Sequence, residues 1–90
     1  MIKRLEAEIS GQVIGVFFRA FVHEHATHLG LKGYAKNQGQ SVQVVAEGEE
    51  AKLQQLLDLI KQGPSGAIVT NVSHQWLPET GKFDQFIILR

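Results

Sequence analysis

Hydrophobic and polar residues alternate in the first segment of the chain and then change their spacing. In the segment from Ile2 to Ile9, the apolar residues Leu5, Ala7 and Ile9 fall at every second position, which is the period of a strand with one buried face. From Phe18 to Leu29 they recur at every third or fourth position, which predicts a helix with one apolar face. Gly30 follows and is typical of a helix end. The chain is therefore expected to open with a strand and a helix.

A hairpin and a second helix are predicted in the middle of the chain. Residues 31–37 and 41–47 have the pattern of strands and flank a short turn at Gln38-Gly39-Gln40. Two acidic residues, Glu49 and Glu50, then suit the N-terminus of a helix, and Gly63-Pro64 suits its end. The apolar face of this helix is formed by a stripe of four aliphatic residues: Leu53, Leu56, Leu57 and Ile60.

Two further strands are predicted in the last third. Residues 67–76 alternate again, and this alternation places Ile68, Val72 and Trp76 on one face. After a turn around residues 78–81, the apolar segment 83–89 indicates a final strand or extension. The complete order is strand, helix, strand, strand, helix, strand, with a last strand.

This order of elements predicts an α+β fold with the ferredoxin-like split βαβ plan. An antiparallel sheet with both helices packed on one face satisfies it. No repeat, linker or low-complexity segment interrupts the 90 residues. Residues 1–90 are therefore expected to form a single domain, with the function carried by the sheet and its loops.

Charge and composition narrow the classes of partner. Nine Lys and Arg residues balance nine Asp and Glu residues, so no overall field favours nucleic acid or an anionic membrane surface. No apolar run approaches the roughly 20 residues that span a bilayer. The first residues alternate with charged ones instead of forming an unbroken apolar stretch, so we expect no secretory signal there. The absence of cysteine suits a reducing compartment. We expect a cytoplasmic protein, a monomer by default, that binds neither nucleic acid nor membrane.

The segment Gly11 to Arg19 leads from the first strand into the first helix and has the features of an anion site. Gly11 and Gly15 let the backbone turn so that successive N–H groups converge. The helix N-terminus adds unpaired N–H groups and the positive end of its dipole. Arg19, in the first helical turn, carries a planar set of donors that matches phosphate oxygens. On spacing alone, a plain strand-to-helix turn with a solvated arginine is the better interpretation of these residues.

The same segment resembles the signature of the acylphosphatase family, Gly-x-Val-Gln-Gly-Val-x-Phe-Arg. The matching residues are Gly11, Val13, Gly15, Val16, Phe18 and Arg19. The similarity continues through Leu29-Gly30-Leu31-x-Gly33-Tyr34 to Asn37. Val42, Glu47-Gly48, Gly63-Pro64 and Ala67-x-Val69 follow in the family order, so the resemblance covers nearly the whole chain.

The resemblance implies a hydrolase that converts an acyl phosphate, its small-molecule substrate, to a carboxylate and inorganic phosphate. It assigns Arg19 to the phosphoryl group, together with the amides of the loop, and the Asn37 side chain to the attacking water. Arg19 and Asn37 are thus the expected catalytic residues. No metal and no cofactor is expected. The expected substrate-binding residues are Gln12, Val13, Ile14, Gly15, Val16, Phe17, Phe18 and Arg19.

Two positions depart from the family pattern. Ile14 stands where the signature has Gln, so a polar side chain beside the anion loop is replaced by an apolar one. The loop after Asn37 is one residue shorter than the usual Asn-x-x-Asp-Gly-x-Val arrangement. These departures leave open a phosphate-binding or regulatory module of the same fold with weak or no catalysis.

Two other classes of function compete with hydrolysis. Lys32-Gly33-Tyr34-Ala35 copies the start of the RNP1 motif of RNA-binding domains, but Lys36-Asn37 replaces the Phe-Val that should follow. His23, His25 and His28 crowd the first helix, but their spacing is not that of a His-Glu-x-x-His metal site. Both alternatives are weaker than the hydrolase.

Overall fold

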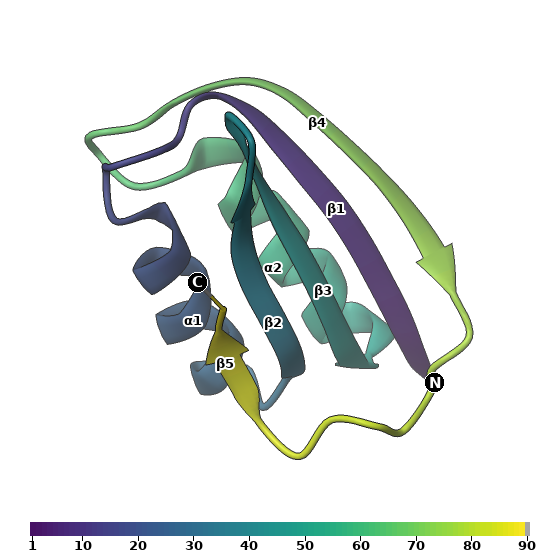
Figure 1. Ribbon diagram of the computed structural model, residues 1–90. Helices are drawn as coiled ribbons and strands as arrows, with labels where there is room; N and C mark the ends of the chain where they lie inside the picture. Colours follow the sequence, from purple (N-terminus) through teal and green to yellow (C-terminus); the bar gives the residue numbers. More distant parts are fainter. Residues whose placement is uncertain (90) are drawn as a thin grey trace.

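Seven elements follow one another in the computed structural model, which describes residues 1–89 (Figure 1). They are β1 (Ile2–Gln12), α1 (Phe18–His28), β2 (Lys32–Gln38), β3 (Ser41–Glu49), α2 (Glu50–Gln62), β4 (Ile68–Leu77) and β5 (Phe86–Ile88). Their order is the one that the hydrophobic pattern predicts. Both helices lie on the same side of the sheet, and the other side is left open (Figure 1). The ferredoxin-like α+β architecture is thereby confirmed.

The five strands form one sheet in the order β4-β1-β3-β2-β5. The pairs β1–β3, β1–β4 and β2–β3 are antiparallel, as expected. The prediction of an entirely antiparallel sheet was wrong for the last strand, because β5 pairs with β2 in parallel. The chain between β4 and β5 crosses from one edge of the sheet to the other (Figure 1), so β5 enters beside β2 in the same direction.

The main core lies between the sheet and the two helices. Alternate strand residues such as Leu5, Ile9, Val42 and Val44 are fully buried there. They meet the apolar face of α1 and the predicted stripe of α2, whose four members Leu53, Leu56, Leu57 and Ile60 are all buried. The apolar positions predicted from the strand period and from the helix period therefore form one common core.

The alternation predicted for β4 is interrupted by a bulge opposite the end of β1. Ser10 pairs with Asn71, but the next residue, Gly11, pairs with Val69. The one-residue shift moves Val69 onto the core side and leaves Ile68 exposed. The expectation that Ile68 shares a face with Val72 and Trp76 was therefore wrong, although Val72 and Trp76 do pack on the core.

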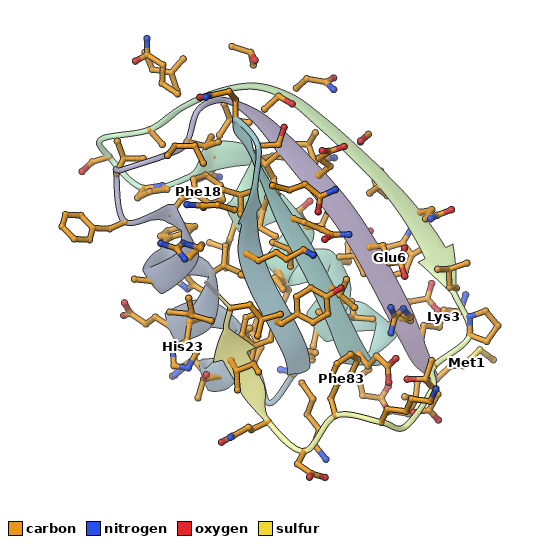
Figure 2. All side chains as sticks on the ribbon, in the orientation of Figure 1. Met1, Lys3, Glu6, Phe18, His23 and Phe83 are labelled. Atoms are coloured by element: carbon orange, nitrogen blue, oxygen red, sulfur yellow. The ribbon has the colours of Figure 1, made fainter. Side chains whose placement is uncertain are left out.

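The crossover segment 78–85 covers one end of the open face of the sheet. The Tyr34 ring lies 5.9 Å from the Phe83 ring in an edge-on arrangement, and the Arg4 guanidinium lies 5.7 Å from the centre of the Phe83 ring. Figure 2 shows Phe83 on this segment, at the end of the sheet where Met1 and Lys3 also lie. Tyr34, the aromatic residue of the RNP1-like sequence, thus packs within the protein, which weakens the RNA-binding alternative.

Candidate active site

The loop from β1 to α1 contains two residues in the left-handed backbone conformation, on either side of Val16. Gly15 has a φ of 76° and Phe17 a φ of 62°, and Phe17 is the only non-glycine residue with positive φ among residues 1–89. The left-handed conformation costs a non-glycine residue roughly 1–2 kcal/mol. The Phe17 side chain gains little packing in return, because 84% of its surface is exposed. Strain of this kind is concentrated at functional sites.

The N-terminus of α1 presents backbone donors without protein partners. Phe17 precedes the helix without a side-chain cap, and no acidic residue stands in the first turn. The first amide that bonds back is that of Phe21, which donates to the Phe17 carbonyl at 3.0 Å. Within the described chain, the N–H groups of Phe18, Arg19 and Ala20 have no acceptor. These three donors and the helix dipole favour an anion at this point.

Arg19 is held in place by the C-terminal part of the chain. Its Nη1 atom donates to the carbonyl oxygen of Leu89 at 3.0 Å, across 70 residues of sequence. The side chain is half-buried, and the other guanidinium N–H groups make no hydrogen bond to the described residues. One donor thus fixes the side chain, while the others are free to form a forked contact with phosphate oxygens.

Asn37 reaches the same region from the β2–β3 hairpin. Its cross-strand partner is Val42, which belongs to the core between sheet and helices, so Asn37 points to the helix side as well. The turn that follows is Gly39-Gln40, one residue shorter than the predicted turn because Gln38 still pairs with Ser41. Gly39 has a φ of 63°, and glycine at this first turn position is typical of a type II′ hairpin. The short turn therefore keeps Asn37 in the ladder at an exposed position.

Most of these residues line one depression of about 640 Å³ at the end of the sheet where α1 begins. Its lining includes five of the eight predicted binding residues, namely Val13, Gly15, Phe17, Phe18 and Arg19, together with Asn37. Gln12, Ile14 and Val16 are not part of it: Gln12 still pairs in β1, Ile14 faces solvent, and Val16 packs against the core. Phe18 is itself a core side chain, so only its backbone is available to a ligand.

Two lining residues were not predicted from the sequence. Ala20 follows Arg19 in the first helical turn, and Ile88 comes from β5. Ala20 could have been inferred from its place in the turn, because its amide is one of the free helix donors. Nothing in the local sequence around Ile88 indicates a site, since its position depends on the pairing of β5 with β2.

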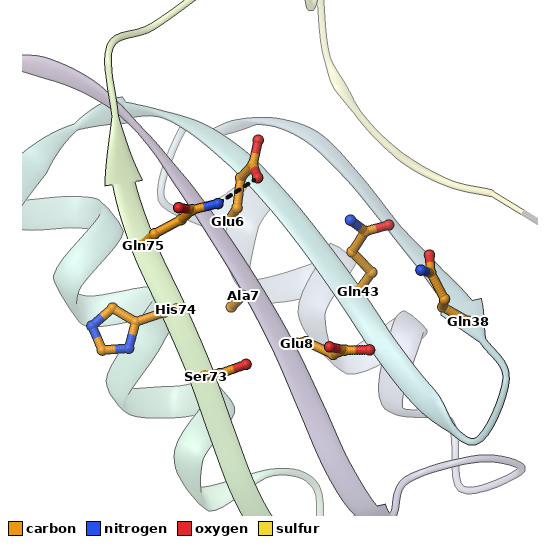
Figure 3. A pocket seen from close by; sticks show the side chains of 8 residues that line it. All are labelled: Glu6, Ala7, Glu8, Gln38, Gln43, Ser73, His74 and Gln75. Carbon is orange, nitrogen blue, oxygen red and sulfur yellow. Dashed lines mark hydrogen bonds between the residues drawn. The ribbon is translucent and has the colours of Figure 1, made fainter.

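A second depression, of about 320 Å³, lies on the open face of the sheet and is lined by acidic instead of basic side chains. Its lining residues belong to β1, β2, β3 and β4. Figure 3 shows Gln75 beside Glu6, and Gln75 donates to Glu6 Oε1 at 3.2 Å. Two carboxylates, Glu6 and Glu8, line it, and no Lys or Arg does. Two like charges oppose the binding of a phosphate here, so the depression beside α1 is the candidate active site.

The histidines of α1 do not converge on a common point. In residues 1–89, no group of three or more His, Cys, Asp and Glu side chains could hold a metal ion. His25 packs its ring edge-on against Phe21, with 4.5 Å between centroids, and His23 lies 6.2 Å from the Phe86 ring. In the same residues neither helix combines the length and apolar character needed to cross a bilayer.

Comparison with known proteins identifies the family. The acylphosphatase family model matches residues 5–88. An acylphosphatase of Dehalococcoides mccartyi (strain CBDB1) is 45% identical over 86 residues, covering 93% of this chain and 94% of the relative. One of Deinococcus radiodurans is 47% identical over 79 residues, with coverages of 87% and 91%. The crystal structure of acylphosphatase from Bacillus subtilis superimposes with a TM-score of 0.94 at 31% identity, covering 100% of both chains. The chain therefore belongs to the acylphosphatase family.

Proposed function

We propose that this protein hydrolyses acyl phosphates with Arg19 and the loop amides holding the phosphoryl group and Asn37 orienting the attacking water. Hydrolysis of acyl phosphates is the activity of the family to which the chain belongs. The observation that carries the assignment of roles is that Arg19, Asn37 and an uncapped helix N-terminus line one depression. The products are a carboxylate and inorganic phosphate.

Hydrolysis of an acyl phosphate mainly requires that the reacting groups are positioned and that negative charge on the phosphoryl oxygens is stabilised. Water attacks phosphorus, the bond between phosphorus and the bridging oxygen breaks, and the carboxylate leaves with the electron pair of that bond. Both protons of the water end on the inorganic phosphate, one of them after transfer to a phosphoryl oxygen. Charge on the three equatorial oxygens can be stabilised by the Arg19 guanidinium and by the free amides of Phe18, Arg19 and Ala20. A carboxylate is a good leaving group, so its departure needs no strong acid. We expect this donor set to act without a metal or a cofactor.

The water requires a separate contact, because a cationic or N–H donor that holds phosphate cannot also accept a hydrogen bond from water. The Asn37 side chain offers both a carbonyl acceptor and an N–H donor. Within the described residues it forms no hydrogen bond with the protein. It is therefore free to hold a water against the bound phosphoryl group, and such positioning is a large part of the catalytic effect.

The test compares the wild type with Arg19→Ala in the hydrolysis of benzoyl phosphate at neutral pH with excess chelator. Charge-assisted hydrogen bonds contribute about 1.5–3 kcal/mol each, so losing two should lower kcat/KM by about 10²-fold or more. Lys52→Ala is the matched control, because it removes an exposed cation of α2 that does not line the depression. Circular dichroism establishes that all three proteins contain the same fold.

The outcomes distinguish a hydrolase from a module of the same fold that binds phosphate without catalysis. Turnover in the wild type and in Lys52→Ala, with strong loss in Arg19→Ala, supports the proposal. Near-normal kinetics in Arg19→Ala would contradict the role of Arg19. Binding of inorganic phosphate by the folded wild type without turnover of the acyl phosphate would favour a phosphate-binding or regulatory module.

We further propose that residues 1–90 act as one domain, as a monomer in the cytoplasm, without nucleic-acid or membrane partners. The balance of nine basic and nine acidic residues and the lack of cysteine support this assignment. Sedimentation of the purified protein tests the monomeric state.

A further inference from the structure

The lining of the candidate active site is mostly apolar, except where the phosphoryl group and the water are expected to bind. Arg19 is the only charged residue of the lining, and Asn37 the only other polar side chain. The remaining side chains are apolar: Val13, Phe17, Phe18, Ala20 and Ile88. Once the phosphoryl group has occupied Arg19 and Asn37 has bound water, no polar side chain of this lining is left for the rest of the substrate.

The acyl group of a bound substrate begins close to this apolar lining. In an acyl phosphate the carbonyl carbon is joined to phosphorus through a single oxygen, so the acyl substituent begins next to the phosphate-binding point. A polar or charged substituent would lose water there without gaining a partner, which is costly. An apolar substituent would instead remove apolar surface from water on both sides.

Ile88 offers such a surface at the edge of the sheet. It pairs with Ala35 of β2, a core residue on the helix side, so Ile88 points to that side and lines the depression. Yet 39% of its surface is still exposed. Its neighbour Ile87 is equally exposed, at 40%, but points to the opposite side of β5 and does not line the depression.

Phe17 offers a second apolar surface on the loop. Its ring is the most exposed large hydrophobic side chain among residues 1–89, and its backbone is held in the left-handed conformation. An aromatic residue that pays for strain without burying its ring gains most if a ligand covers it. Phe17 and Ile88 are distant in the sequence and line the same depression.

We propose that Ile88 and Phe17 form an acyl-binding surface that makes this protein selective for acyl phosphates with a bulky apolar acyl group. This inference rests on the proposed function and adds the substrate class to it. The preferred substrates are aromatic or branched aliphatic acyl phosphates. Small acyl phosphates such as acetyl phosphate share the phosphoryl contacts but leave the acyl-binding surface exposed.

The test measures kcat/KM for benzoyl phosphate and for acetyl phosphate and compares their ratio between variants. Comparing ratios removes the different intrinsic reactivity of the two substrates. Ile88→Ser should lower the benzoyl-to-acetyl ratio by about three- to tenfold. This is at or below the low end of what a contact in a hydrophobic pocket contributes to discrimination, because Ile88 stays 39% exposed. Phe17→Asn should lower it in the same direction, because Asn removes the ring and tolerates the left-handed backbone.

Ile87→Ser is the matched control for Ile88→Ser. It removes the same side chain from the same strand at nearly the same exposure, so its effect on folding should be similar. We expect it to leave the ratio within about twofold of the wild type. The inhibition constant of inorganic phosphate, which reports the phosphoryl contacts alone, should be unchanged in both isoleucine variants.

The possible results distinguish this inference from the proposed function. If the wild type hydrolyses both substrates and Ile88→Ser changes the ratio no more than Ile87→Ser does, the acyl-binding surface is wrong while the hydrolase stands. If the folded wild type hydrolyses neither substrate, the proposed function is wrong and the selectivity falls with it. A selective loss of benzoyl phosphate turnover in Ile88→Ser establishes the acyl-binding surface.

Discussion

At the scale of single residues, Asn37 has the role that a substitution can isolate best. Asn37→Ala removes the amide that we expect to hold water, but leaves Arg19 and the helix amides in place. Turnover of benzoyl phosphate should fall by about 10²- to 10³-fold, as for other single positioned polar groups. The inhibition constant of inorganic phosphate should change little. Steady-state kinetics with phosphate as inhibitor measures both quantities.

Gln38→Ala is the control for this substitution, because Gln38 is the next residue of the same hairpin, equally exposed, and points to the opposite face. Loss of phosphate affinity in Asn37→Ala with an unchanged kcat would assign Asn37 to the phosphoryl group instead of the water.

Arg19 and Asn37 could be identified as candidate site residues from the sequence. The Leu89 carbonyl that orients Arg19 could not, because the contact joins residues 70 positions apart.

At the scale of elements, the bulge between β1 and β4 lies where the chain passes from the sheet into the loop between β1 and α1. Gly11 has a φ of 129°, and a Cβ atom there would overlap the carbonyl oxygen of Ile68 and the amide of Thr70. Gly11→Ala should therefore lower the free energy of unfolding by about 2–4 kcal/mol, since backbone strain and steric overlap add. Urea unfolding followed by circular dichroism measures the loss.

Gly39→Ala separates the two causes. Gly39 also has positive φ, at 63°, but a Cβ atom there would meet nothing within 4 Å. This variant should lose only the conformational term of about 1 kcal/mol. Equal losses in both variants would mean that the strands do not approach at Gly11 as closely as the structure has them.

The bulge also shows which structural features could not be predicted from the sequence. The existence and order of the helices and strands follow from hydrophobic spacing, because each period is local. The side on which Val69 and Ile68 fall depends on a shift between two strands that are distant in the sequence. The alternation of β4 carries no sign of that shift, and so it assigned Ile68 to the wrong face.

At the scale of the whole molecule, the path from β4 to β5 was the least predictable feature. The final strand was expected from its apolar residues, but its parallel pairing with β2 requires the chain to cross the end of the sheet. That crossing is secured by Glu47 of β3. The alternation of β3 places Glu47 on the open face of the sheet, where a charged residue is expected to be exposed. The segment matters for function as well, since it delivers Ile88 and the Leu89 carbonyl to the active site.

Glu47 joins the crossover segment to the open face through a buried carboxylate that is only 5% exposed. Its Oε2 atom accepts hydrogen bonds from Arg4 Nη1 at 3.0 Å, from the Thr80 amide at 3.0 Å and from Thr80 Oγ1 at 2.8 Å. Its Oε1 atom accepts one from the Gly81 amide at 3.0 Å. Burial alone would raise the pKa of Glu47, but the hydrogen bonds from Thr80, Arg4 and Gly81 outweigh it and lower the pKa below its ordinary value of 4.5.

A lowered pKa in the folded state predicts how stability depends on pH. The contribution of ionised Glu47 is complete above its ordinary value of 4.5 and is lost as pH falls from there through the folded pKa. Glu47→Gln should therefore lower the free energy of unfolding at pH 7, by about 1–3 kcal/mol, and the difference from the wild type should shrink below pH 4.5. Urea unfolding between pH 7 and pH 3 measures this. The control is the exposed Glu50, which pairs with Lys3 at the surface: Glu50→Gln should cost less than about 1 kcal/mol. A gap between Glu47→Gln and the wild type that stays constant across this range would show that the carboxylate charge does not hold the crossover segment.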